Sequence, residues 1–142
     1  MAGSTAGQAK ETYNDLFRVL GDNNRATEAS THLAKLTQDQ QGLSEWTKIC
    51  EGVWATYGES LPIEGLTEAA NETVKTGKVV GVLADALNWA GISEDAFNEA
   101  LTNCNTEAER EQLLRETLLN TYESTAELYE KNSKASLDYN DA

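Results

Sequence analysis

Apolar residues recur along this chain at steps of three and four, which is the spacing of one face of an α-helix. The clearest series runs from Leu43 through Trp46, Cys50 and Val53 to Tyr57. The chain has a single proline, is rich in Ala, Leu, Glu and Thr, and offers almost no alternating β-branched runs of the kind that form strands. The sequence therefore predicts an all-α fold, a compact bundle of about six or seven helices.

Glycines mark where helices are predicted to end. Gly21, Gly58, Gly77 and Gly91 each follow an apolar helical run. Glycine adopts the left-handed conformation that closes many helices without the steric cost of a Cβ atom. We therefore expect four helices to stop at these positions, which argues against one continuous rod.

Capping residues predict where helices begin. Thr106 with Glu109, and Thr37 with Gln40, have the spacing of a capping box. In this motif the first side chain accepts a hydrogen bond from the backbone N–H of the second residue, and the second side chain accepts one from the backbone N–H of the first. Ser93 stands immediately before a run that opens with two acidic residues, which the helix dipole favours in a first turn. We expect a helix to follow each of these caps.

The chain divides into three parts by composition. Residues 1–7 are small and polar, typical of a disordered or vector-derived lead-in. Residues 8–130 are expected to form the helical domain, and residues 131–142, where polar residues dominate, either a frayed end or a continuing helix. A chain of 142 residues suffices for one domain with its own core.

Charge excludes one class of partner. The sequence has 24 acidic and 11 basic residues, a formal net charge of -13, so nucleic acid and anionic membranes would repel it. The longest apolar stretch, residues 79–92, is too short to cross a bilayer and contains Asp85 and Asn88. We expect no nucleic-acid partner and no membrane contact for this segment.

Candidate chemistry is sparse. His32 is the only histidine, so neither a two-histidine metal site nor a histidine-based triad can form within one chain, and we expect no metal and no cofactor. Acid pairs such as Glu107 and Glu111 are expected to lie on helix surfaces. Cys50 and Cys104 match no metal-binding spacing and are expected to be reduced. The sequence predicts that the chain is not an enzyme.

Two groups of residues are candidates for a structural or binding site. Asp85, Asn88 and Trp89 interrupt an otherwise apolar helix, and we expect a buried polar network covered by the indole, with a binding site as the alternative. Trp46 and Trp54 are candidates for an interaction surface, because indole rings supply large amphipathic contact areas.

One stretch of the chain carries a family resemblance. Leu61-Pro-Ile-Glu-Gly-Leu-Thr-Glu-Ala-Ala70, together with Leu83-Ala-Asp-Ala-Leu-Asn-Trp-Ala-Gly-Ile-Ser-Glu-Asp-Ala-Phe97, closely resembles a segment of tail tape measure proteins of phages and prophages of Gram-positive bacteria. The resemblance extends more weakly over residues 13–17 and 43–46 upstream, and to about residue 129 downstream.

The resemblance implies a structural role. Tape measure proteins are much longer than this chain, occupy the tail tube, set its length during assembly and leave before DNA passes. The chain is then expected to be a fragment that contacts phage tail proteins or copies of itself, in the virion tail and, during assembly, in the cytoplasm of the bacterial host. No catalytic residues carry over. The alternative is a free-standing helical adaptor that binds a partner peptide in a groove near the tryptophans.

Overall fold

The computed structural model describes residues 2–37 and 39–141, with side chains described for residues 10–37, 39–123, 125 and 126. The described residues form seven α-helices and no strand, which confirms the predicted all-α bundle. In chain order the helices are α1 (Ala2–Leu20), α2 (Asn23–Leu36), α3 (Gln40–Tyr57), α4 (Ile63–Thr76), α5 (Gly81–Trp89), α6 (Glu94–Thr102) and α7 (Glu107–Asp141), with one 3-10 turn, η1 (Gly58–Ser60), after α3.

The four predicted glycine stops are confirmed, since Gly21, Gly58, Gly77 and Gly91 all have positive φ. Gly77 shows why glycine is needed there. It is the left-handed C-cap of α4 with φ 78°, and its backbone N–H donates to Thr73 O at 2.8 Å. That hydrogen bond satisfies a carbonyl that the end of the helix would otherwise leave open.

Two of the three predicted N-terminal caps are confirmed. The Ser93 side chain accepts from the Ala96 backbone N–H at 3.2 Å, and Thr106 Oγ1 accepts from the Glu109 N–H at 3.1 Å. The cap predicted at Thr37 is wrong. Asp39 caps α3 instead, with its carboxylate accepting from the Gly42 N–H at 3.3 Å.

Both ends of the chain are helical where the structure describes them. Residues 2–7, expected to be a disordered lead-in, form the first turns of α1, and their alanines favour that conformation. For residues 131–141 the structure shows the continuing helix rather than the frayed end, because α7 runs to Asp141.

The core forms where α3 packs on α7, the most extensive helix contact in the described part of the chain. The predicted face of α3 is buried at Leu43, Trp46, Cys50 and Val53, and Tyr57 is half-buried against the same core. The next largest contacts are those of α2 with α4 and of α1 with α2. These three contacts place α2, α3, α4 and α7 at the centre of the bundle.

Two of these central contacts join helices that run in the same direction. Between α3 and α7, Trp46 meets Glu111 and Tyr57 meets Tyr122, and each pair is 65 residues apart in sequence. Between α2 and α4, Arg25 bonds to Glu64 and the His32 carbonyl bonds to Asn71, and each pair is 39 residues apart. When the sequence separation is the same at two contact points, the residue numbers of both helices increase in the same direction, so each pair of helices is parallel.

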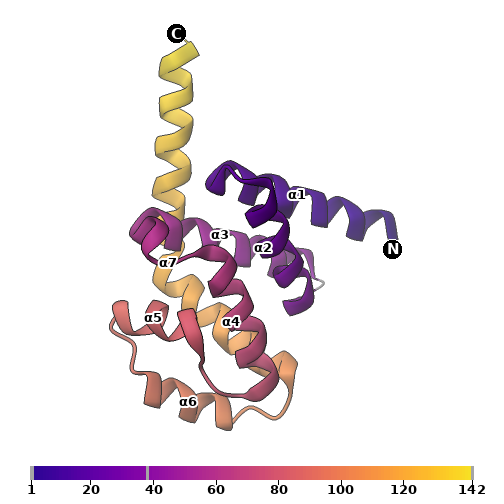
Figure 1. Ribbon diagram of the computed structural model, residues 1–142, viewed down its shortest axis with the longest axis vertical. Coiled ribbons are helices and arrows are strands. Elements are labelled where there is room, and N and C mark those ends of the chain that lie inside the picture. Colours follow the sequence, from indigo (N-terminus) through magenta and orange to yellow (C-terminus); the bar gives the residue numbers. More distant parts are fainter. Residues whose placement is uncertain (1, 38, 142) are drawn as a thin grey trace.

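Helix α7 extends beyond the bundle. Its 35 residues span about 52 Å at the rise of an α-helix. The first part packs in the core, where Leu114, Leu118 and Ala126 are completely buried. The C-terminal part projects past all the other helices (Figure 1). The molecule is therefore a compact bundle that carries a protruding helix.

Candidate functional site

A buried polar cluster lies between α3 and α7. The indole Nε1 of Trp46, which is completely buried, donates to Glu111 Oε1 at 3.0 Å. Arg115, one turn after Glu111, places its Nε atom 3.6 Å from Glu111 Oε1 and 3.4 Å from Glu45 Oε1. One guanidinium thus faces two carboxylates, and one of those carboxylates also receives the indole hydrogen bond.

Burial governs the charge of this cluster. Glu111 is only 6% exposed, and this burial raises the pKa of its carboxyl group, while the Trp46 hydrogen bond and the Arg115 charge act in the opposite direction. The Nε and Nη1 atoms of Arg115 are shielded from solvent without a hydrogen bond. Such a cluster costs desolvation energy, so we interpret it as a device that fixes how α7 sits on α3.

The prediction for Glu111 was wrong, because it is a buried residue and not an ordinary surface acid. The sequence did contain a signal for its burial. Glu111 precedes Leu114, Leu118 and Tyr122 at steps of three and four, so it continues the apolar stripe of α7. An acid on such a stripe needs a buried partner, and Trp46 is that partner.

A second polar contact joins the same two helices farther along. The Tyr122 hydroxyl donates to the Ala86 carbonyl oxygen at 2.7 Å and lies 3.0 Å from the Tyr57 hydroxyl. Burial, and then the hydrogen bond with Tyr57, raise the pKa of Tyr122. This ring therefore ties α7 to α3 and α5 at once.

The backbones of α3 and α7 approach closely beside Tyr122. A Cβ atom added to Gly52 would lie 2.8 Å from Tyr122 Cβ and would also clash with the Tyr122 carbonyl oxygen. Real Cβ atoms essentially never come this close, so only glycine fits at this point of α3.

The prediction of a buried polar network at Asp85 and Asn88 is wrong, because both side chains are exposed. Helix α5 has only nine residues, and its core-facing side is formed by Leu83, Ala86 and Leu87. The two polar residues occupy the other side. Trp89 does not cover them: it is 49% exposed and packs edge-on against Tyr57, with ring centroids 5.1 Å apart.

The two tryptophans predicted to form an interaction surface, Trp46 and Trp54, differ in their burial. Trp46 is completely buried and cannot belong to a surface, so that prediction is wrong. Trp54 is half-buried against the core, and its role in binding stays a prediction. Trp89 and Phe17 are the large hydrophobic residues that the described part of the chain exposes most.

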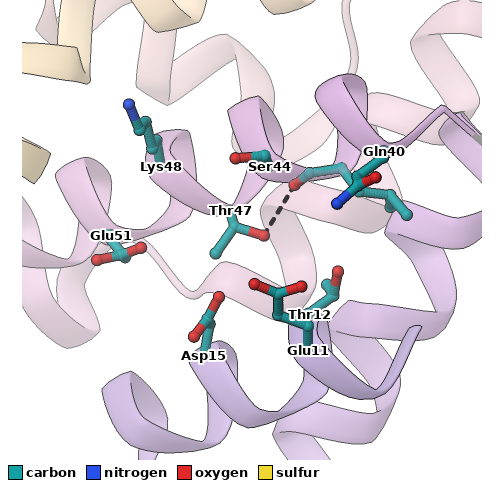
Figure 2. Close-up of a pocket in the computed structure, with 9 residues that line it drawn as sticks. Glu11, Thr12, Asp15, Gln40, Ser44, Thr47, Lys48 and Glu51 are labelled. Atoms are coloured by element: carbon teal, nitrogen blue, oxygen red, sulfur yellow. Dashed lines mark hydrogen bonds between the residues drawn. The ribbon is translucent and has the colours of Figure 1, made fainter. Parts of the chain in front are cut away.

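A small polar hollow lies between α1 and α3 (Figure 2). Glu11, Thr12 and Asp15 come from α1, and Lys48 and Glu51 are among the residues that α3 contributes. Its volume of about 140 Å³ falls below the roughly 300–1,000 Å³ of pockets that enclose drug-sized ligands. We interpret it as a gap between two polar helix faces.

Both cysteines of the chain are free thiols. Cys50 is completely buried in the core, and this burial raises its pKa. Cys104 is half-buried at the end of α6, and its Sγ lies 3.6 Å from the Ala100 carbonyl oxygen. The buried thiol acts as a small hydrophobic side chain, as expected from its place on the α3 stripe.

Possible metal ligands gather at one place among the described residues. Glu28, His32 and Glu68 bring a nitrogen atom and two carboxylates within 4.8 Å of one another. The first two residues lie on α2 and the third on α4. The sequence did not predict this cluster, because Glu68 is far from the other two along the chain.

The fold and these contacts define an all-α bundle with a buried polar seam between α3 and α7. The chain matches no family model, and comparisons with curated proteins and with solved structures found no match. Within the described residues, every helix is too short or too polar to cross a membrane.

Proposed function

We propose that this chain is a structural module of a phage tail tape measure protein, acting in tail assembly and length determination through contacts of its helices. The residues that resemble such proteins, 61–70 and 83–97, cover the first part of α4, most of α5 and the first turn of α6. They include the buried residues Leu66, Leu83 and Phe97. The resemblance thus involves residues that shape the bundle as well as residues on its surface.

The protruding part of α7 is the observation that carries this proposal (Figure 1). Residues 127–141 extend about 22 Å beyond Ala126, the last completely buried residue described. An isolated helix of this length is marginal in water, so packing against another chain would stabilise it. A helix anchored in a bundle at one end and open to partners at the other suits a module that joins an elongated assembly.

The clearest experiment is an in-frame deletion of the segment in a phage that encodes it. As one continuous helix, 142 residues would measure roughly 210 Å, whereas the bundle spans far less. We expect tails that shorten by much less than this value, or tails of normal length on particles with reduced infectivity. Electron microscopy and plaque counts measure both.

Two results would contradict the proposal or part of it. Unchanged tails together with full infectivity would remove the assembly role. Shortening by roughly 210 Å, the continuous-helix value, would keep the tape measure assignment but would mean that the segment is stretched in the tail. Genomic neighbourhood offers a separate check, because genes for the tail tube should flank the parent gene.

The second candidate is a free-standing adaptor that binds a partner peptide. The observation that favours it is Trp89, which is 49% exposed and held edge-on by Tyr57. Exposed aromatic residues of this kind often anchor binding partners. An isolated short reading frame, with no tail genes beside it, would favour the adaptor over the tail module.

A further inference from the structure

The cluster of Glu28, His32 and Glu68 combines residue types that bind transition metals. Glu28 and His32 are one turn apart on α2, so they point from the same face of that helix. Glu68 comes from α4, which packs on α2. The three ligand atoms lie within 4.8 Å of one another, and His32 Nε2 is 3.8 Å from Glu28 Oε1.

The His32 imidazole is incompletely satisfied. Its side chain is 19% exposed, yet the Nε2 atom itself is shielded from solvent and makes no hydrogen bond. At 3.8 Å the nearest carboxylate oxygen is beyond hydrogen-bonding distance. A shielded nitrogen without a partner is uncommon in native proteins, and an ion between the imidazole and the carboxylates would give it one.

The surrounding helices hold the cluster in place from both sides. One side is fixed by Arg25, whose Nε donates to Glu64 at 3.0 Å. The other side is fixed by Asn71, whose Nδ2 donates to the His32 backbone carbonyl at 2.7 Å. These two bonds set the separation of α2 and α4, so the metal ligands would need only side-chain rotation to close on an ion.

We propose that Glu28, His32 and Glu68 bind one zinc ion, with water completing the coordination. Ligand atoms around a tetrahedral zinc lie about 3.3 Å apart, as follows from metal–ligand distances near 2.0–2.1 Å. The 3.8 Å between His32 and Glu28 is close to this value, and both glutamates are exposed and free to rotate inward. Imidazole nitrogen favours zinc over calcium or magnesium, which take oxygen ligands.

Charge and access fit a cation. His32 and Glu68 also line an open hollow of about 400 Å³, which gives an ion a path from solvent. The other charged residues of that hollow are Glu72, Lys35 and Lys75. Glu28 lies beside the hollow, so the site has three carboxylates and two lysines around it, and both lysines are exposed and can turn their ammonium groups outward.

Calorimetric titration of the full chain with zinc chloride tests the site. The protein is first treated with a chelator, and it carries Cys104→Ser so that the half-buried thiol cannot bind the metal. We expect one zinc per chain. His32→Gln and Glu68→Gln should each weaken binding at least about tenfold, because replacing even an outer partner of a metal ligand costs 10–100-fold.

Glu99→Gln is the matched control, since it removes one exposed carboxylate on α6 and should leave zinc affinity unchanged. Excess magnesium chloride should not displace the zinc. Because the chain has one histidine, NMR signals of its imidazole should move on zinc addition and report the site directly.

Three results would overturn the proposal. They are the absence of saturable zinc binding below millimolar concentrations, full affinity in His32→Gln, and displacement by magnesium as expected for a diffuse acidic surface. Circular dichroism checks that His32→Gln folds. If that variant is unfolded, Glu68→Gln decides, because Glu68 is an exposed residue and its loss leaves the core intact.

Discussion

The indole nitrogen of Trp46 and the carboxylate of Glu111 meet at 3.0 Å although 65 residues separate them in sequence. This bond joins α3 to α7 inside the core and fixes the rotation of each helix against the other. The Tyr57 and Tyr122 hydroxyls meet with the same sequence offset. The two contacts together define a single register for the central pair of helices.

Trp46→Ala should destabilise the domain by about 3–5 kcal/mol, the usual cost of removing a buried aromatic side chain. The tryptophan is completely buried, and its loss would also leave Glu111 without its indole donor. Urea unfolding followed by circular dichroism measures the change. A loss below about 1 kcal/mol, the range of surface substitutions, would contradict the central position of this ring.

Trp46→Phe separates packing from hydrogen bonding at the same position. The phenyl ring keeps much of the apolar volume but has no N–H group to donate to Glu111. We expect a cost of about 1–3 kcal/mol, the range for leaving a buried polar group unsatisfied. A variant as unstable as Trp46→Ala would show that the lost hydrogen bond, which both variants share, outweighs the apolar volume that phenylalanine keeps.

Glu111→Gln should change how stability depends on pH. Burial raises the pKa of Glu111 above its ordinary value of 4.5, so the folded state binds this proton more tightly than the unfolded state. The resulting stabilisation is present at low pH and is lost as pH rises through the raised pKa. Glutamine cannot ionise, so the stability of the native protein should fall relative to Glu111→Gln as pH increases above 4.5.

Urea unfolding of both proteins at a series of pH values measures this difference. The decisive observation is whether the stability of the native protein relative to Glu111→Gln falls or rises with pH. A native protein that gains stability relative to Glu111→Gln with rising pH would show that Arg115 and Trp46 outweigh the cost of burying the carboxylate.

Gly52→Ala should be strongly destabilising, because the new methyl group would press on the backbone of α7 at Tyr122. Overpacking of a core typically costs about 1–3 kcal/mol, and here the obstacle is main chain that cannot rotate away. Gly65→Ala is the matched control within α4. Its Cβ would lie 3.1 Å from a Val82 methyl group, which can shift, while alanine improves helix propensity by about 1 kcal/mol.

Thermal unfolding should therefore show a clear loss for Gly52→Ala and little change for Gly65→Ala. Equal effects of the two substitutions would mean that α3 and α7 do not approach each other as closely as the structure shows.

Tyr122→Phe tests the second contact between α3 and α7. The substitution removes the hydroxyl that donates to Ala86 O at 2.7 Å and keeps the ring. We expect a loss of about 1–3 kcal/mol, because a buried carbonyl on α5 would lose its donor. Tyr57→Phe should cost less, since the Tyr122 bond to Ala86 would remain. The opposite order in urea unfolding would assign the main role to Tyr57.

The helices themselves could be predicted from local sequence. Periodic apolar residues identified the buried face of α3, and the glycines identified four helix ends, because both signals act within a few residues. The cap at Asp39 was missed for a local reason: Thr37 and Asp39 are both good capping residues, and the choice depends on how α3 packs.

The candidate sites could not be predicted in the same way. The Trp46 and Glu111 pair, and the approach of Glu68 to His32, depend on which helices become neighbours. At Asp85 and Asn88 the sequence predicted a buried network that the structure does not contain. The pattern of α5 suggested burial on most sides, but a nine-residue helix at the edge of the bundle is covered on only one.

Because Cys50 is buried, the chemical reactivity of its thiol reports opening of the hydrophobic core. A thiol that is completely shielded and whose pKa is raised reacts with alkylating reagents only when the core around it separates. Cys104 is half-buried and should react without such an event. In a Cys104→Ser protein, the rate at which Cys50 is alkylated would therefore measure how often the core around α3 opens, with no label added to the native structure.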